Sequence, residues 1–240
     1  MPVPDRLRPA ALAALVVLLS QPAMAQRCRQ ALALGLDVSL SVNPADFSLQ
    51  RGGLARALID PEVMAAILIA PDDVVELAIF EWSGQYDQAL LVDWTPIRSR
   101  ADLERIAGVL LDTPQIERTG RTAIGAAMRY GAELLRDRAR CGTQTLDLSG
   151  DGPNNNGAPP ERVRAELRAQ GIIVNGLAIE TPDSTTEGET APRARLRGYY
   201  EARVITGASA FVETVFGFEN FEAAMKRKLL RELIPAVAQR

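Results

Sequence analysis

A short segment of the chain carries three oxygen-bearing side chains on alternate residues. It reads Asp37-Val-Ser39-Leu-Ser41 and directly follows a run of apolar residues. Because alternate side chains of extended backbone share a face, the carboxylate of Asp37 and the hydroxyls of Ser39 and Ser41 can meet one small ion. The simpler alternative is that Ser39, Ser41 or Asn43 only caps the helix expected after this loop.

Two further oxygen ligands occur at the ends of other expected elements. Thr122 stands at a helix start in Gly120-Arg-Thr-Ala-Ile-Gly125, and Asp151 follows a strand in Leu148-Ser-Gly-Asp-Gly152. Hydroxyl and carboxylate oxygens without nitrogen or sulfur select hard divalent cations. Three neutral oxygens and two carboxylates suit Mg²⁺. Mn²⁺ and Ca²⁺ are the alternatives, although Ca²⁺ usually takes more ligands than these.

The composition excludes several classes of catalytic site. The 240-residue chain contains no histidine, which removes Ser-His-Asp and Cys-His nucleophiles and histidine-bound zinc. A metal-assisted hydrolase would then need a carboxylate base, for which Glu81, Glu180 or a ligand aspartate are the candidates. No Gly-x-Gly-x-x-Gly follows the first strand, which argues against a dinucleotide enzyme. We therefore expect a protein that is not an enzyme.

Strands and helices alternate along most of the chain. Apolar runs predict strands, and capped or amphipathic segments predict helices between them. The expected strands are 30–36, 74–82, 89–94, 145–149, 172–179 and 210–215. The expected helices are 44–58, a short one from 61, and 100–111, 122–138, 160–170, 199–205 and 218–234. A turn signal at Ser83-Gly84 makes 89–94 an antiparallel edge strand, and the polar residues 181–197 are expected to form a long exposed loop.

This alternation predicts one α/β domain with a doubly wound, mostly parallel six-stranded sheet and helices on both faces. Ligands of such sheets bind beyond the carboxyl ends of the strands. Asp37 and Asp151 stand at two of these ends. We expect their side chains to face solvent there and to contribute little to the core.

Other side chains near the carboxyl ends of strands are candidates for a rim that recognises a partner. Glu81, Trp82 and Glu180 end two of the expected strands, and Tyr199 and Tyr200 follow the long loop. The alternative is that Trp82 packs into the edge of the core and that both tyrosines pack on a helix face.

The amino terminus has the pattern of a secretory signal. A short basic lead precedes an apolar stretch from Ala10 to Leu19, and a small-x-small site ends at Ala25. We expect cleavage of residues 1–25, which leaves residues 26–240 as one domain, periplasmic or secreted, without a transmembrane anchor. An uncleaved membrane anchor is the alternative. The net charge of −3 gives no sign of a nucleic-acid binder.

The serine loop, the separate threonine and the separate aspartate together resemble the von Willebrand factor type A (VWA) family and its metal-ion-dependent adhesion site (MIDAS). The resemblance covers about residues 29–234, and five positions match the family pattern: Asp37, Ser39, Ser41, Thr122 and Asp151. The stretches from Ser149 to Asn156 and from Glu81 to Gly84 look more narrowly like an exported bacterial subfamily of VWA proteins without an assigned function.

The resemblance implies a Rossmann-like VWA fold and a cation-dependent module that binds a protein. The partner would present an Asp or Glu carboxylate to the metal, and Mg²⁺ is the cation expected. Two alternatives stay open, namely a structural module whose metal only stiffens the loops and a metal-assisted hydrolase.

The resemblance also implies a disulfide. In the VWA topology the strands that follow Cys28 and Cys141 are adjacent and parallel. Cys28 lies nine residues before Asp37 and Cys141 lies ten before Asp151, so both cysteines are expected at nearly the same height. Adjacent strands are about 4.8 Å apart, a separation that a disulfide accepts. Two cysteines in an exported chain agree with this pairing.

Overall fold

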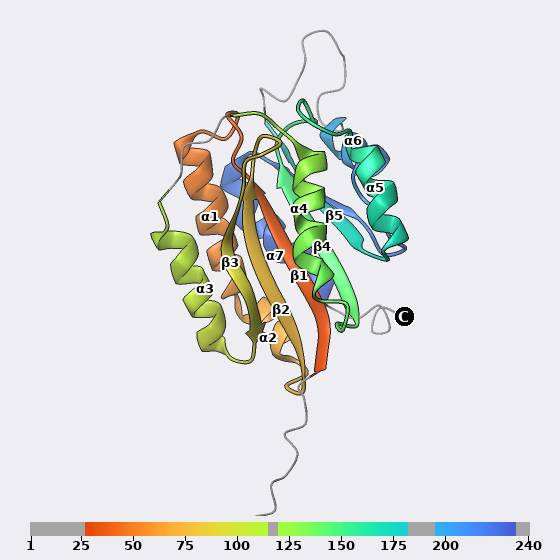
Figure 1. Cartoon of the computed structure of the whole chain (residues 1–240). Helices are drawn as coiled ribbons and strands as arrows, with labels where there is room; N and C mark the ends of the chain where they lie inside the picture. Colours follow the sequence, from red (N-terminus) through yellow and green to blue (C-terminus); the bar gives the residue numbers. More distant parts are fainter. Residues whose placement is uncertain (1–26, 115–119, 182–194, 234–240) are drawn as a thin grey trace, which may run out of the picture.

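One six-stranded sheet runs through the middle of the molecule (Figure 1). The computed structural model describes residues 27–114, 120–181 and 195–233. The strands are β1 (Arg27–Asp37), β2 (Asp73–Trp82), β3 (Gln88–Ile97), β4 (Thr143–Gly150), β5 (Ile173–Glu180) and β6 (Val212–Phe216). Their order is β3-β2-β1-β4-β5-β6, and only the pairing of β2 with β3 is antiparallel. The predicted fold class and the antiparallel edge strand are confirmed.

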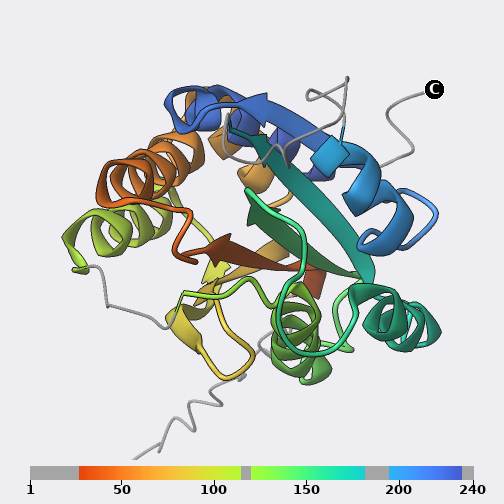
Figure 2. The same cartoon turned by 90° about the horizontal axis from the view of Figure 1, so that it is seen from above.

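Helices cover both faces of the sheet, as Figure 2 shows from above. One face carries α1 (Pro44–Leu58), α2 (Pro61–Leu68), α3 (Arg100–Asp112) and α7 (Phe221–Leu233), which follows the short 3-10 helix η3 (Phe218–Asn220). The other face carries α4 (Ile124–Arg136), α5 (Pro160–Ala169) and α6 (Arg195–Arg203). Within the described ranges, no helix combines the length and the apolar character needed to cross a membrane.

The central strand β1 is apolar on both sides because both of its faces are covered. Leu32, Leu34 and Leu36 belong to the core on the side of α1 and α7. Ala31 and Ala33 belong to the second core, on the side of α4. A strand that is buried on both faces reads as a continuous hydrophobic run without alternation, which is the pattern that predicted it.

The first two helices begin at the caps that the sequence predicts. The side chain of Asn43 accepts hydrogen bonds of 2.8 and 3.0 Å from two backbone N–H groups in the first turn of α1. Asp60 caps α2 in the same way. A proline follows each cap, where the missing N–H costs nothing because that donor would have no partner inside the helix.

Several predicted boundaries were wrong. α4 begins at Ile124, so Thr122 lies in the turn before the helix. α6 begins at Arg195, inside the stretch expected to be an exposed loop, because Leu196 and Tyr200 are buried and anchor it against the sheet. β6 begins and ends later than expected, at 212–216. The predicted signal segment 1–25 and most of the expected loop, 182–194, lie outside the described residues.

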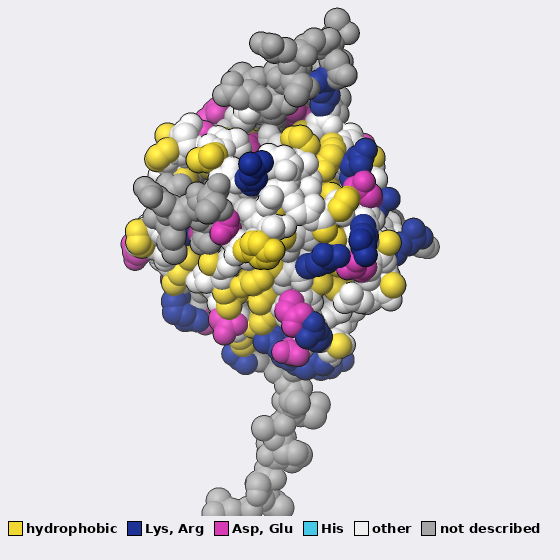
Figure 3. Space-filling view, turned by 45° about the horizontal axis from the view of Figure 1, so that its top comes forward, with side chains coloured by type: hydrophobic (Ala, Val, Ile, Leu, Met, Phe, Trp, Pro, Cys, Tyr) yellow, Lys and Arg dark blue, Asp and Glu magenta, His cyan; other side chains and the backbone are white. Residues whose placement is uncertain are grey.

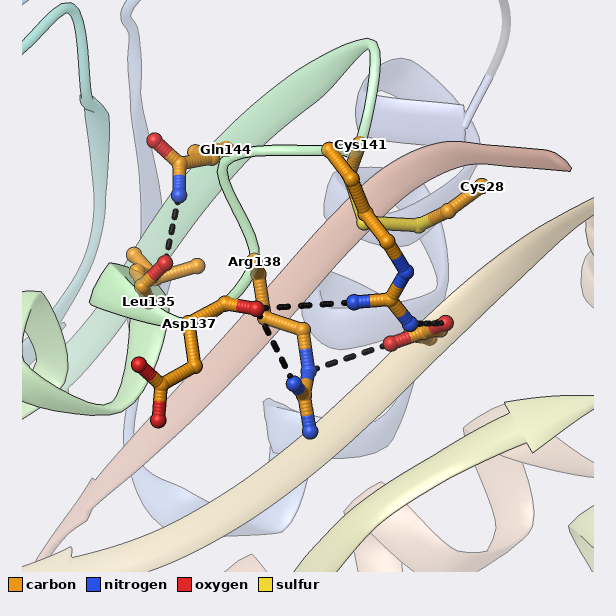
Figure 4. The surroundings of a disulfide bond; sticks show 8 residues. Cys28, Leu135, Asp137, Arg138, Cys141 and Gln144 are labelled. Carbon is orange, nitrogen blue, oxygen red and sulfur yellow. Dashed lines mark hydrogen bonds and ion pairs between the residues drawn. A yellow bond between two sulfur atoms is a disulfide. The ribbon is translucent and has the colours of Figure 1, made fainter.

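A disulfide joins Cys28 and Cys141 at the amino ends of β1 and β4 (Figure 4), in the pairing expected from the sequence. Their Cα atoms are 4.5 Å apart. Glu76 of β2 lies beside the disulfide and forms ion pairs with Arg138 and Arg140. These contacts tie three neighbouring strands together at the edge opposite to the carboxyl ends of the parallel strands.

A buried ionic cluster fixes α7 to the sheet. Lys228 is fully buried, and its Nζ lies 2.7 Å from Asp147 Oδ1 of β4 and 2.6 Å from Glu232 Oε1. Burial and the neighbouring Glu232 carboxylate raise the pKa of Asp147 to about 7, although Lys228 opposes the shift. Burial disfavours the charge of Lys228, but the two carboxylates outweigh it and raise the pKa of this lysine. Such a cluster specifies one position of the helix more than it adds stability.

Candidate metal centre

Three loops at the carboxyl edge of the sheet bring the predicted ligands together. The neighbouring strands β1 and β4 lead into Asp37 and Asp151, respectively. The hydroxyl of Ser41 donates a hydrogen bond of 2.7 Å to Asp151 Oδ1, and Ser39 Oγ lies 3.1 Å from Ser41 Oγ. Thr122 lines the same cleft as Ser41 and Asp151. The side chains named by the sequence pattern therefore meet in one region.

The serine loop is folded by its own backbone. The N–H of Ser39 donates to Asp37 Oδ1 at 2.8 Å, and the N–H of Val42 donates to the carbonyl of Ser39 at 3.0 Å. Leu40 donates its N–H to the carbonyl of Gly120 at 3.4 Å, which links this loop to the one that carries Thr122. Because Asp37 Oδ1 is used inside the loop, Oδ2 is the oxygen that remains for a further ligand.

The two carboxylates of the site are buried, so the expectation that they face solvent was wrong. Asp37 is 0% exposed and Asp151 is 3% exposed, because helices cover the sheet up to the ends of β1 and β4. Neither Oδ2 atom receives a hydrogen bond from the described residues. Burial and the charge of Asp151 raise the pKa of Asp37 to about 8, and burial also raises the pKa of Asp151. Since buried charges need partners, this oxygen set fits a divalent cation.

Gln50 of α1 connects the ends of the two ligand-bearing strands. Its Nε2 donates to the backbone carbonyl of Asp37 at 2.8 Å, and its Oε1 accepts from the hydroxyl of Ser149 at 3.1 Å. Gln50 is fully buried. It therefore holds the last residues of β1 and β4 at a fixed separation. The sequence did not indicate this role, because an isolated glutamine inside a helix is usually a surface residue.

Asn155 holds the loop that carries Thr122. Its side-chain Oδ1 accepts a hydrogen bond of 2.9 Å from the N–H of Thr122, and its own N–H donates to the carbonyl of Thr122, also at 2.9 Å. Both polar groups of the Thr122 backbone are thus bound by one residue that lies shortly after Asp151. The threonine and the aspartate are positioned relative to each other through this pair of contacts.

The residues on either side of Asn155 make equivalent contacts to other loops. Asn154 Oδ1 accepts from the N–H of Gly125 at the start of α4, at 3.3 Å. Asn156 Oδ1 accepts from the N–H of Gln85 in the turn between β2 and β3, at 2.8 Å. The run of three asparagines after the Asp151 turn was the available signal, but the sequence does not tell which loops it binds.

A cleft of about 590 Å³ opens beside the candidate ligands. Ser41, Thr122 and Asp151 line one part of it, and Arg195, Leu196 and Tyr199 of α6 line another, together with Phe218 of η3. A volume of this size lies within the range of pockets that hold small ligands or side chains of a partner. The cleft gives a bound group a route to the oxygen cluster.

One protein-family model matches most of the chain. The family model described as "Protein of unknown function (DUF1194)" matches residues 27–237. The chain belongs to the DUF1194 family. Comparison with curated proteins gives no match.

Solved structures show that this DUF1194 chain has the VWA fold. Proximal thread matrix protein 1 from the mussel byssus, in a structure with a zinc-occupied MIDAS motif, is 17% identical, with a TM-score of 0.58 over 86% of this chain and 46% of that one. The pilus adhesin SpaC from Lactobacillus rhamnosus GG is 12% identical, with a TM-score of 0.63 over 86% and 30%. A von Willebrand factor type A protein from Catenulispora acidiphila is 13% identical, with a TM-score of 0.57 over 86% and 43%. The DUF1194 chain spans less than half the length of these three proteins.

The expected recognition rim of Glu81, Trp82 and Glu180 was wrong for this DUF1194 chain. All three side chains are buried. The carboxylate of Glu81 forms a buried ion pair of 2.7 Å with Arg51 of α1, and Trp82 belongs to the core beside α4. The rim fails because helices cover β2 and β5 as far as their last residues. Packing of Trp82 into the core, the alternative, is what the structure shows.

A second group of potential ligands in the DUF1194 chain lies at the opposite edge of the sheet. Cys28, Glu76 and Cys141 bring a carboxylate close to two sulfur atoms. The two sulfurs are bonded to each other, whereas a cysteine binds a metal as its thiolate. The intact disulfide therefore leaves the oxygen cluster around Asp37 as the candidate metal centre of the described residues.

Proposed function

We propose that the chain is an exported module that binds a protein partner through a divalent cation. The cation is held by Asp37, Ser39, Ser41, Thr122 and Asp151. The observation that carries the proposal is the meeting of two buried carboxylates, each with one oxygen lacking a hydrogen bond from the described residues, at the ends of adjacent strands. When bound, a cation of this kind offers an open coordination position to a carboxylate of the partner.

Mg²⁺ is the cation that we propose. All five side chains offer oxygen, which favours hard cations over those that prefer nitrogen or sulfur. Two carboxylates balance the charge of a dication, and the small ligand number suits an ion that retains water molecules. The zinc in the mussel protein's MIDAS motif supports a divalent cation at this place in the fold.

Exposed hydrophobic side chains beside the oxygen cluster support recognition of a protein. Leu40, between the two serines of the loop, is 77% exposed, and Tyr86, in the turn held by Asn156, is 87% exposed. Figure 3 shows hydrophobic groups gathered between separate charged groups on the face that includes this edge. Apolar side chains around a polar centre are typical of interaction surfaces, and a metal that only stiffened the loops would not require them.

The hydrolase alternative loses the support of its two glutamate candidates for a general base. Glu81 is held by Arg51, and Glu180 is buried and accepts a hydrogen bond of 3.4 Å from the N–H of Arg197. Neither glutamate lines the cleft beside the cluster. A general base has to lie within reach of the water that it activates.

The disulfide agrees with the proposed export, because disulfides persist in oxidising compartments. The disulfide between Cys28 and Cys141 is of a kind that persists outside the cytoplasm. We therefore keep the proposal of a periplasmic or secreted protein, cleaved after Ala25.

The proposal is tested by cation-dependent capture. Immobilised wild-type protein and the Thr122→Ala variant are each exposed to a periplasmic extract in Mg²⁺ and then washed with EDTA. We expect a protein that the wild type retains, that EDTA releases and that Thr122→Ala does not bind. Retention that is equal in Mg²⁺ and EDTA would contradict the proposal and favour a module with a structural metal.

A further inference from the structure

Tyr200 of α6 brings a buried hydroxyl to the candidate metal centre. The side chain is fully buried, and its Oη has no hydrogen-bond partner among the described residues. A methyl group built on Gly150 would lie 2.6 Å from Tyr200 Oη and 3.0 Å from Asp37 Oδ2. The phenol and the carboxylate therefore border the same small space at the end of β4.

Two glycines on adjacent strands make room for the Tyr200 side chain. A methyl group on Gly176 of β5 would lie 2.4 Å from Tyr200 Cδ1, and one on Gly150 of β4 would lie 2.6 Å from its Oη. Real Cβ atoms do not approach other atoms this closely, so any side chain at either position would displace the ring or the hydroxyl. The ring crosses β5 at one glycine, and its hydroxyl reaches the end of β4 at the other.

The neighbouring residue on α6 also contacts the metal-site loops. Tyr199 Oη accepts a hydrogen bond of 3.1 Å from the N–H of Asn154, in the loop that begins with Asp151. Two consecutive residues of α6 thus lie against two different parts of the centre. Tyr199 holds the Asp151 loop, and Tyr200 lies beside Asp37.

We propose that Tyr200 is a positioning residue of the metal centre, whose hydroxyl donates toward Asp37 Oδ2 when the cation is bound and then fixes the plane of that carboxylate. This inference rests on the proposed function, since it requires a cation at the centre. Asp37 Oδ1 already accepts the N–H of Ser39, so Oδ2 is the oxygen that needs orientation. A phenol is suited to this task because it is a neutral donor, whereas a lysine or arginine would compete with the cation for the carboxylate.

The test compares wild type, Tyr200→Phe and the control Tyr130→Phe, which removes the same hydroxyl from a ring that packs on Phe80. Mg²⁺ affinity is measured by calorimetry, and melting temperature is measured in EDTA and in Mg²⁺. We expect about tenfold weaker Mg²⁺ binding for Tyr200→Phe and no change for Tyr130→Phe. In EDTA, Tyr200→Phe is expected to melt at or above the temperature of wild type, because the variant removes a buried hydroxyl without a partner among the described residues.

A merely structural role for Tyr200 gives a different result. It would lower the melting temperature equally in EDTA and Mg²⁺ and leave the affinity unchanged, which would overturn the inference. If wild type binds Mg²⁺ and Tyr200→Phe binds it with the same affinity, only the proposed role of Tyr200 is overturned. Wild type that binds no divalent cation overturns the proposed function and this inference with it.

A second variant tests the shared space directly. Gly150→Ala places a methyl group between the phenol and the carboxylate, so we expect loss of stability and of Mg²⁺ affinity. Combining it with Tyr200→Phe removes the closest clash, so the double variant is expected to melt above Gly150→Ala alone. Strictly additive effects of the two substitutions would show that the residues do not share this space.

Discussion

The hydroxyl of Ser41 donates a hydrogen bond of 2.7 Å to Asp151 Oδ1, across 110 positions of the sequence. This contact joins the loop after β1 to the loop after β4. It brings Asp151 to the side of the buried Asp37, whose pKa is raised first by burial and then by the charge of Asp151. The centre is therefore destabilising without a cation, and this property can be measured.

Replacement of Asp151 by Asn should stabilise the protein without its cation. The variant keeps an oxygen for Ser41 but removes a buried negative charge beside Asp37. In EDTA we expect a higher melting temperature than that of wild type, and in Mg²⁺ a smaller gain from the cation. Asp72→Asn, an exposed carboxylate at the far edge of the sheet, makes the same change of charge and should alter neither value. If Asp151→Asn melts below wild type in EDTA, the carboxylates of Asp37 and Asp151 do not destabilise the protein by repulsion.

Asn155→Ala should weaken cation binding more than it weakens the fold. The substitution removes the acceptor of the Thr122 N–H, with an expected loss of about 1–3 kcal/mol of stability and about tenfold in Mg²⁺ affinity. Asn156→Ala removes a similar bond to Gln85 and is the matched control. We expect comparable denaturant midpoints for the two variants, with the loss of affinity confined to Asn155→Ala. Equal affinities would show that Asn155 does not position Thr122.

Reduction of the disulfide should lower stability without affecting the centre. The bond joins residues 113 positions apart, so the chain-entropy model gives a loss of about 4–5 kcal/mol. The disulfide lies at the amino ends of β1 and β4, whereas the proposed ligands lie at their carboxyl ends. Denaturant titration with and without reductant gives the stability, and calorimetry of the folded, reduced protein gives the Mg²⁺ affinity. A large change in Mg²⁺ affinity on reduction would show that the disulfide end of the sheet influences the metal centre at the other end.

The cluster at Lys228 should make stability depend on pH. Burial first, and Glu232 second, raise the pKa of Asp147 from 3.8 to about 7, so the folded chain binds a proton that the unfolded chain releases. This contribution to stability is complete below about pH 4 and is lost as the pH rises to about 7. Asp147→Asn should therefore flatten the fall in unfolding free energy over this interval, measured by denaturant titration in EDTA. The same slope in variant and wild type would exclude Asp147 as its source.

Features set by local chemistry were predictable from the sequence. The apolar run that ends at Asp37 and the cap at Asn43 depend on neighbouring residues alone, and the structure places both as expected. The VWA pattern added that the strands after Cys28 and Cys141 are adjacent and parallel, and through this the pairing of the two cysteines.

Features set by contacts between distant segments were not predictable. Glu81 could be taken for a rim residue because neither the sequence around Arg51 nor that of β2 predicts the ion pair between them. The contact of Gln50 with Ser149 spans 99 positions, and the hydroxyl of Tyr200 borders the same space as Asp37 only because two strands carry glycines there. The sequence named the candidate ligands, while the residues that position them depend on tertiary packing.

Calorimetric titration of metal-stripped protein with Mg²⁺ measures whether the chain binds a divalent cation at this centre. Wild type and Thr122→Ala are compared after circular dichroism has shown that both are folded. We expect binding of one cation per wild-type chain, at least about tenfold weaker binding by Thr122→Ala, and a rise in the wild-type melting temperature with Mg²⁺. A folded wild-type protein that shows neither binding heat nor a shift in melting temperature with Mg²⁺, Mn²⁺ or Ca²⁺ would contradict the proposed metal centre.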